Sequence, residues 1–433
     1  MANVADLIGD TVLGAYRLAG NFARPFVPGV LAARVRRGKE DGRRIAERYG
    51  HASAIRPTGR VVWVHAASVG ETNAVLPLVV RLTARGIHVV LTSTTTTSAA
   101  IAARRLPRNA IHQFGPLDIG PFVDRFLGHW RPELAIFVES EIWPTVIARL
   151  DRLGIPLAIV NGRLSERSFR GWRRFSWVAS AAFSRIALAL AQSEEDGARF
   201  RTLGAPRVAV TGNLKFDVPP LAAEPDEVER LLTDIGQRPV WVAASTHPGE
   251  EELIADAHRL MRARHPGLLT IIVPRHPERG DDVRAILAAR RLSVAQRSRG
   301  EPLVREADVY LADTLGELGL FYRVAPIAFL GGSLVVTGGQ NPIEPVMLDT
   351  AVLHGPHVHN FAEIYGHLDR AVAPPPIADA ATLATAVSAL LASPRAAAER
   401  ARAATAALRP LAGALEATLR GLEPLLAAGA APS

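Results

Sequence analysis

The chain has 433 residues, 48% of them hydrophobic, which is enough apolar material for two or three folded domains and excludes disorder as its main state. It carries 50 basic and 42 acidic residues, and its only lysines are Lys39 and Lys215. The net charge of +8 favours a polyanionic partner, which can be nucleic acid, anionic lipid or a phosphorylated substrate. Because there is no cysteine, disulfides, thiolate zinc sites and cysteine nucleophiles are excluded.

Residues 1–50 predict an amphipathic helix followed by a basic segment. At 100° per residue, charged residues gather on one side of the helix, and the opposite side is apolar, with Val4, Leu7, Ile8, Val12, Leu18 and Phe22. The longest uncharged run in this segment, 25–33, has nine residues and is too short to span a bilayer. An interfacial helix on an anionic membrane fits this pattern, and a helix packed on its own domain is the alternative.

From residue 60 onward, apolar runs alternate with helical patterns, which predicts βαβ units and parallel sheets. A stretch rich in proline and acidic residues follows Lys215, and the same alternation then restarts. We therefore expect an α/β fold with two Rossmann-like domains that face a central cleft. The predicted parts of the chain are 1–50, 51–217, 218–395 and, as C-terminal helices, 396–433.

Ligands bind beyond the carboxyl ends of the strands in such sheets, so polar residues there are the candidates for chemistry. Glu71 follows the first strand at a strand-to-helix turn, where a carboxylate can accept a proton from a hydroxyl group. Its alternative role is to complement the helix N-terminus. Glu139 and Glu141 leave another buried strand, where two acids are costly unless they are paired or functional, although one of them can cap the next helix.

Two features of the basic residues are also informative. Lys215 stands near the joint between the halves, in a chain whose basic residues are almost all arginine. The site can therefore require a compact ammonium, and the alternative is that this lysine is present by chance. A dense arginine patch suits phosphate or headgroup recognition and equally a solvated helix face; it consists of Arg163, Arg167, Arg170, Arg173 and Arg174.

In the second half, glycines 338 and 339 precede a helix start that would suit a phosphate, and Glu344 could accept from ribose hydroxyls. Neither a Walker sequence nor a close GxGxxG is present, so ATP hydrolysis and ordinary dinucleotide binding lose support. The histidines of 354–359 could suggest a metal site, but the glycine and proline between them break regular ligand geometry, and no metal is expected.

The motifs HAASVGE, ESEIWP, NGRLSERS, GNLKFD, VPRHPER, DTLGELGLFY, GGQNPIEP and HGPHVHNF resemble, in this order, those of the Kdo transferase family. That family transfers 3-deoxy-D-manno-octulosonic acid (Kdo) from CMP-Kdo to a lipid A precursor in lipopolysaccharide synthesis. The resemblance spans roughly residues 35–370. It implies an inverting, metal-independent glycosyltransferase of the GT-B fold, without a cofactor, at the cytoplasmic face of the bacterial inner membrane.

The resemblance also implies roles for individual residues. Glu71 would be the general base that takes the proton from a glucosamine 6-hydroxyl of lipid IVA, and Glu139 and Lys215 would stabilise the transition state. Residues 51–217 would bind the acceptor and 218–395 the donor. The implied CMP contacts are Pro274, Arg275, Leu315, Gly316, Glu317, Asn341, Pro342, Ile343 and Glu344.

Within this family the positive charge points to lipid phosphates and an anionic membrane, and nucleic acid is not an expected partner. The arginine patch then becomes a candidate for acceptor phosphates or headgroups. Three positions depart from the family pattern: Ala66 replaces a common serine, Gly162 an alanine and Gln340 a histidine. The alternatives are another GT-B lipid glycosyltransferase or a sugar-nucleotide epimerase with a uridine sugar nucleotide, and a non-catalytic two-lobed sugar-binding module.

Overall fold

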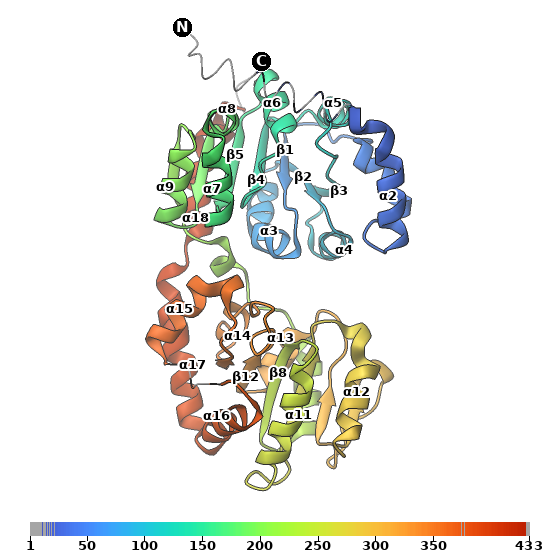
Figure 1. Ribbon diagram of the computed structural model, residues 1–433, viewed down its shortest axis with the longest axis vertical. Helices are drawn as coiled ribbons and strands as arrows, with labels where there is room; N and C mark the ends of the chain where they lie inside the picture. The colour runs from blue at the N-terminus through green and yellow to red at the C-terminus, as the bar shows by residue number, and fades with distance from the viewer. Residues whose placement is uncertain are drawn as a thin grey trace. The chain divides into compact units, whose positions relative to one another are not determined.

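The computed structural model describes residues 22–373, 375 and 377–429, together with residues 11, 14, 16, 18 and 20. The chain divides into two compact units. Unit 1 runs up to Val218 and resumes at Leu411, and unit 2 is Pro219–Pro410. Each unit contains one parallel sheet with helices on both faces (Figure 1).

Unit 1 is built on a seven-stranded sheet, called sheet 1, with the order β3-β2-β1-β4-β5-β6-β7. Its strands are β1 (Val61–His65), β2 (His88–Ser93), β3 (Ala110–Phe114), β4 (Leu134–Val138), β5 (Leu157–Gly162), β6 (Leu188–Ala191) and β7 (Val208–Val210). All neighbouring pairs are parallel. The strand order reverses between β1 and β4, which is where open α/β sheets bind their ligands.

The strands of unit 1 form because runs of β-branched and aromatic residues are buried on both faces of the sheet. On one face, Trp63 packs against Phe126 and Phe137, and the centroids of these two rings lie 4.7 and 4.9 Å from that of Trp63. On the other face, leucines of two helices cover the sheet. The helices of unit 1 are η1 (Arg24–Phe26), α2 (Val27–Arg36), η2 (Gly42–Tyr49), α3 (Val69–Ala84), α4 (Thr96–Arg105), α5 (Gly120–Trp130), α6 (Pro144–Arg152), α7 (Glu166–Arg174), α8 (Ser176–Phe183), α9 (Glu194–Thr202), η3 (Leu214–Asp217) and α18 (Ala414–Ala428).

Unit 2 has a six-stranded parallel sheet, called sheet 2, with the order β10-β11-β9-β8-β12-β13. Its strands are β8 (Val240–Thr246), β9 (Leu269–Pro274), β10 (Val294–Gln296), β11 (Val309–Leu311), β12 (Ile327–Leu330) and β13 (Ala351–His354). Its helices of four or more residues are α10 (Pro225–Ile235), α11 (Glu250–Met261), α12 (Gly280–Ala289), α13 (Leu318–Val324), α14 (Ile343–Val346), α15 (Ala362–Ala371), α16 (Ala380–Ala392) and α17 (Pro394–Leu408). The α/β class and the two Rossmann-like sheets predicted from the sequence are confirmed.

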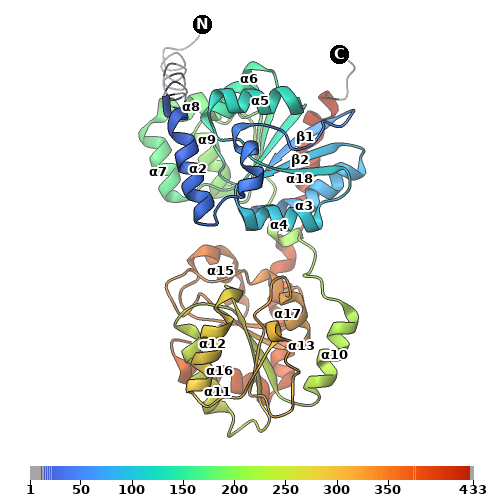
Figure 2. The ribbon, with the colours of Figure 1, turned by 90° about the vertical axis from the view of Figure 1, so that its right-hand side faces the viewer.

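The C-terminal helices differ from the prediction, which treated 396–433 as one segment. α17 belongs to unit 2, whereas α18 packs against α3 of unit 1 (Figure 2). The reason is that Leu419, Leu422 and Leu426 are buried in the core of unit 1. In addition, Asp217 accepts hydrogen bonds of 2.7 and 2.6 Å from the first backbone N–H groups around α18. The unit boundary after Val218 lies one residue from the predicted division.

Much of the predicted N-terminal amphipathic helix lies outside the described residues, including Val4, Leu7, Ile8 and Val12. Of its predicted apolar side, Leu18 and Phe22 are described, and both are exposed. Further along, Val27 and Leu31 of α2 are buried against α5 of the same unit. Among the described residues, no helix combines the length and the apolarity needed to cross a membrane.

Candidate active site

Glu71 lies at the start of α3, immediately after the strand that borders the switch point of sheet 1. Ser68 is the N-cap of α3, and its hydroxyl donates to Glu71 Oε1 over 2.8 Å and accepts from the Glu71 backbone N–H over 3.3 Å. The backbone N–H of Ala67 donates to the other carboxylate oxygen over 2.8 Å. Glu71 therefore does place an acidic side chain in the first turn of its helix, whose N-cap is Ser68, and these hydrogen bonds fix the direction of its carboxylate.

The surroundings of Glu71 make its carboxylate a proton acceptor near neutral pH. The residue is 9% exposed. Burial raises the pKa of Glu71 to about 7; hydrogen bonds from Ser68 and Ala67 oppose this rise, and the charges of Glu139 and Glu141 add to it. A general base is most effective when its pKa lies near the working pH. The role at the helix N-terminus and the proposed catalytic role are thus compatible in one side chain.

Glu139 and Lys215 form an ion pair in the same unit, with Lys215 Nζ 2.7 Å from Glu139 Oε1. Glu139 directly follows β4, the other strand at the switch point, and has a left-handed backbone with φ of +58°. This conformation costs a non-glycine residue about 1 to 2 kcal/mol, so the surrounding structure must hold it in place. The structure thereby brings together all three predicted catalytic residues, since the charge of Glu139 also acts on Glu71.

Two asparagines that the sequence reasoning missed position Lys215. Asn161 Oδ1, at the end of β5, accepts from the backbone N–H of Leu214 over 2.9 Å, and Asn161 itself has a φ of +53°. Asn213 is the N-cap of η3 and accepts from the backbone N–H of Lys215 over 3.0 Å. Asparagine tolerates the left-handed region better than most residues, and its position at a strand end is the signal that could have identified Asn161.

Glu141 is held by aromatic neighbours at the same edge of sheet 1. The Trp143 indole N–H donates to Glu141 Oε2 over 2.8 Å, and the Trp143 and His65 ring centroids are 4.4 Å apart. Burial lowers the pKa of His65, so its ring is neutral at pH 7. Thr92 Oγ1 lies 2.8 Å from His65 Nδ1, and His65 Nε2 lies 3.6 Å from the Glu141 carboxylate. His65 and Trp143 were not among the predicted site residues.

The five arginines of the predicted phosphate patch lie on α7 and the loop before it, and all five are exposed. Arg170 pairs with Glu166 over 2.7 Å, and the guanidinium carbon of Arg173 lies 5.6 Å from the centroid of the Phe169 ring. No hydrogen bond or ion pair among the described residues joins the five to Glu71, Glu139 or Lys215. The patch is therefore a cationic surface that makes no direct polar contact with these three residues.

The predicted CMP-binding residues of unit 2 all follow the carboxyl ends of strands. Pro274 ends β9 and Arg275 after it is exposed. Residues 315–317 follow β11, where Gly316 has a φ of +86° and the Glu317 carboxylate accepts from Arg297 Nε over 2.7 Å. Hydrogen bonding by the Arg297 guanidinium holds the pKa of Glu317 below its usual range.

The third predicted group, 341–344, forms the start of α14. Asn341 Oδ1 accepts from the backbone N–H of Ile343 over 3.2 Å, and its amide nitrogen lies 3.3 Å from the Glu344 carboxylate. Pro342 is the N-cap residue of this helix. The three groups lie at the carboxyl edge of sheet 2, after β9, β11 and β12.

Glu250 and His247, which the sequence reasoning did not assign, organise the glycine loops of that edge. The buried Glu250 carboxylate accepts from the backbone N–H groups of Gly332, Ser333, Leu334 and His247 over 2.7 to 3.1 Å. His247 Nε2 lies 3.1 Å from the Gln340 amide nitrogen. An imidazole is thus present beside the position where the family pattern usually has histidine and this chain has Gln340.

The histidine cluster that could have suggested a metal is engaged in ordinary contacts. His354 Nδ1 lies 2.8 Å from the carbonyl oxygen of Gly355, and its Nε2 lies 3.0 Å from Asp369. Within the described part of the chain, no group of three or more histidine, aspartate or glutamate side chains is arranged to hold a metal ion.

Comparisons with known proteins agree on one family. Residues 43–218 match the family model described as 3-deoxy-D-manno-octulosonic-acid transferase (kdotransferase). The 3-deoxy-D-manno-octulosonic acid transferase of Bordetella pertussis is 38% identical over 95% of this chain and 98% of its own length. The enzyme of the same name from Haemophilus influenzae is 39% identical over 74% of this chain and 77% of its own length. Among solved structures, the UDP-GlcNAc 2-epimerase from Neisseria meningitidis bound to UDP-GlcNAc shares the fold, with a TM-score of 0.59 over 84% of this chain and all of that one at 12% identity.

Two Rossmann-like parallel sheets, the first with a buried carboxylate of raised pKa at its switch point, define an α/β protein of the GT-B type. At 12% identity, the similarity to the epimerase shows a shared fold and nothing about activity. The extended matches at 38% and 39% identity go further, and the chain belongs to the 3-deoxy-D-manno-octulosonic acid transferase family.

Proposed function

We propose that this protein transfers Kdo from CMP-Kdo to the glucosamine 6-hydroxyl of a lipid A precursor, with inversion at the anomeric carbon. Membership of the family supports the reaction class, and the observation that carries the mechanism is Glu71 with its pKa of about 7. In the proposed step, Glu71 takes the proton of the acceptor hydroxyl as its oxygen attacks the anomeric carbon. The bond between that carbon and the phosphate oxygen breaks, and CMP leaves with the electron pair.

Lys215 has the charge needed to stabilise such a transition state. Its ammonium can offset negative charge on the phosphate or carboxylate of the donor. The ion pair of 2.7 Å with Glu139 supports this role, because it restricts the position of a flexible side chain before the substrate binds. Glu139 in turn keeps a negative charge near Glu71, which favours the protonated form and hence keeps the pKa of the base high.

Donor binding is proposed for unit 2, through the three strand-end groups at 274–275, 315–317 and 341–344. The support is their common position at the carboxyl edge of a parallel sheet, together with the positive φ of Gly316, which opens the backbone to a ligand. The exposed arginines of α7 are proposed to contact acceptor phosphates or headgroups.

We also propose that the protein acts at the cytoplasmic face of the inner membrane. Leu18, Phe22, Phe26 and Val30 are 58% to 79% exposed and recur every fourth residue, so they share one side of the N-terminal helical segment. Exposed basic residues follow on the same segment, including Arg36, Arg37, Lys39 and Arg43. An apolar ridge beside basic residues suits an anionic bilayer surface.

The test is to incubate the purified protein with CMP-Kdo and the tetraacyl disaccharide bisphosphate. We expect release of CMP together with a gain of one or more Kdo masses on the lipid, and a loss of transfer of at least a hundredfold in Glu71→Gln. Asp196→Asn is the matched control, because the buried Asp196 carboxylate at the start of α9 likewise accepts from an N-cap serine, Ser193, and from a backbone N–H, that of Leu164. No transfer by the unaltered protein would refute the reaction, and full transfer by Glu71→Gln would refute the base.

A further inference from the structure

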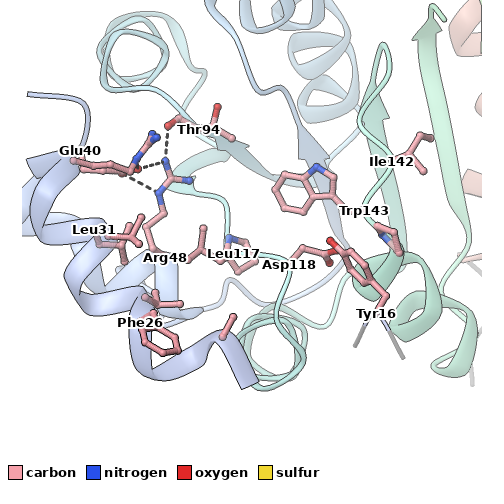
Figure 3. Close-up of a pocket in the computed structure, with 16 residues that line it drawn as sticks. Tyr16, Phe26, Leu31, Glu40, Arg48, Thr94, Leu117, Asp118, Ile142 and Trp143 are labelled. Carbon is pink, nitrogen blue, oxygen red and sulfur yellow. Dashed lines mark hydrogen bonds and ion pairs between the residues drawn. The ribbon is translucent and has the colours of Figure 1, made fainter. Parts of the chain in front are cut away.

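A pocket of about 590 Å³ opens in unit 1 between the N-terminal helical segment and the edge of sheet 1. Phe26 of η1 and Leu31 of α2 line one side, Ile142 and Trp143 line the other, and Leu117 lies between them (Figure 3). Its volume lies in the range of small-molecule sites. None of the residue roles assigned above accounts for a cavity at this place.

The pocket is connected to the candidate base by two hydrogen bonds. Thr94 lines the pocket, and its hydroxyl donates to the carbonyl oxygen of Ala67 over 2.7 Å. The backbone N–H of Ala67 donates to Glu71 over 2.8 Å. On the opposite wall, the Trp143 indole donates to Glu141. One end of the pocket therefore lies at the edge of the sheet where the acceptor hydroxyl must be placed.

The other end of the pocket meets the exposed apolar ridge. Phe26 and Val30 belong both to the ridge and to the pocket lining, and they are 73% and 58% exposed. Leu18 and Phe22 continue the ridge by two further turns without lining the pocket. The apolar surface is thus continuous from the proposed membrane contact into the pocket.

The charged side chains of the lining already have hydrogen-bond partners within the protein. The apolar walls therefore remain to face a ligand. Arg48 is 3% exposed and donates to Glu40 over 3.0 and 3.2 Å and to the carbonyl oxygens of Gly115 and Thr94. Arg34 donates to the same Glu40 carboxylate over 2.9 Å (Figure 3 shows Arg48 between Glu40 and Thr94). Asp118 accepts from the backbone N–H groups of Thr145 and Val146 and so caps α6.

We propose that this pocket binds one fatty acyl chain of the lipid acceptor, an inference that rests on the proposed function. The chain enters from the ridge side, where Phe26 and Val30 continue the bilayer surface, and the sugar end of the lipid lies toward Thr94 and Glu71. The exposed basic residues that follow on the same segment, Arg36, Arg37, Lys39 and Arg43, suit the anionic lipid to which the chain is attached. A free apolar peptide or protein segment would not require a positively charged border.

Ala23→Trp tests this proposal by filling the pocket from an exposed position, without altering a buried core residue. The measurement is the ratio of kcat/KM for the tetraacyl acceptor to that for its deacylated, water-soluble bisphosphate. We expect this ratio to fall about tenfold, since each methylene excluded from a half-open groove costs about a factor of two. Phe26→Ala is the second variant and is expected to lower the ratio in the same direction.

Phe22→Ala is the matched control, because Phe22 is 79% exposed on the same ridge but does not line the pocket. It should weaken binding to anionic vesicles and keep the ratio of the two acceptors within twofold. An unchanged ratio in Ala23→Trp, or equal changes of the ratio in Phe22→Ala and Phe26→Ala, would overturn the acyl-chain proposal while the transferase function stands.

Direct binding separates the failure of this proposal from the failure of the proposed function. Titration with cis-parinaric acid, a fluorescent fatty acid, should show one saturable site that is lost in Ala23→Trp and is competed by the tetraacyl acceptor. Saturable binding without competition would assign the pocket to a different lipid and overturn the proposal. If the unaltered protein transfers Kdo to neither acceptor, the proposed function fails, and the competition result still decides whether the pocket holds the chain of that lipid.

Discussion

Replacing Glu71 by glutamine is expected to abolish transfer and at the same time to stabilise the protein above neutral pH. The pKa of Glu71 is about 7 instead of 4.5, so ionising this carboxyl costs about 3 kcal/mol more in the folded chain than in the unfolded chain. The folded state holds the proton more tightly. The free energy of unfolding therefore falls as the pH rises from about 4.5 to about 7, and it is constant with respect to this group above that range.

Glutamine cannot ionise, and its carbonyl oxygen and amide group can still hydrogen-bond to the Ala67 backbone N–H and the Ser68 hydroxyl. The free energy of unfolding of Glu71→Gln relative to the unaltered protein should therefore increase by up to about 3 kcal/mol between pH 4.5 and pH 8. Any loss from weaker capping contributes a constant offset of about 1 kcal/mol at both pH values.

The assay is urea unfolding of both proteins at pH 4.5 and pH 8, with the fluorescence transition of unit 1 followed through its buried tryptophans. Glu194→Gln replaces an exposed carboxylate in the first turn of α9 and controls for the loss of a helix N-terminal charge. If the difference between Glu71→Gln and the unaltered protein is the same at both pH values, the argument from burial is wrong.

Three further outcomes are expected. In the unaltered protein, kcat/KM should fall about tenfold per pH unit below pH 7 as Glu71 protonates, and a flat profile between pH 5.5 and 7 would contradict the base assignment. Lys215→Arg should lower kcat by about ten- to a hundredfold with the fold intact, because a planar fork cannot replace an ammonium held 2.7 Å from Glu139; full activity would show that the site needs only a positive charge. Asp217→Ala should lower the stability of unit 1 by about 1 kcal/mol through loss of the α18 cap, and an unchanged melting curve would remove that explanation for the position of the helix.

Reversing the charges of Arg167 and Arg174 should raise KM for the lipid acceptor severalfold and leave CMP-Kdo binding by calorimetry unchanged. Both side chains are exposed on α7, so the substitutions should not disturb the core. Equal weakening of donor and acceptor would count against a role in acceptor recognition.

The sequence predicted the interior strands of the two sheets well, with the exception of β6, because buried parallel strands leave continuous apolar runs such as those of β1 and β4. It also missed the strands at the edges of the two sheets, which are β3, β7, β10 and β13. Whether a short segment becomes a strand depends on its neighbours in the sheet, which the local pattern does not show. The path of α18 was also missed, since an alanine-rich amphipathic pattern does not state which core its leucines will enter.

At the site, the motifs and the positions of polar residues at strand ends predict Glu71, Glu139 and Lys215 from the sequence alone. They did not select Asn161 or His65, which act through backbone hydrogen bonds and ring contacts. Such contacts depend on a residue's neighbours in space, and a single sequence does not encode them locally. The presence of Gly162, where the family pattern has alanine, also has a spatial reason, because a Cβ there would lie 2.9 Å from the Phe200 ring.

The division of unit 1 between the start and the end of the chain has a consequence for its biosynthesis. The core of unit 1 contains Leu419, Leu422 and Leu426 of α18, so it is incomplete until these residues have left the ribosome. Unit 2, Pro219–Pro410, is contiguous and is fully synthesised earlier. We therefore expect unit 2 to finish folding first during translation, while the half that carries the catalytic carboxylates waits with an open hydrophobic face. A chain truncated after Pro410 should accordingly expose the β1 to β4 region to proteases while protecting unit 2.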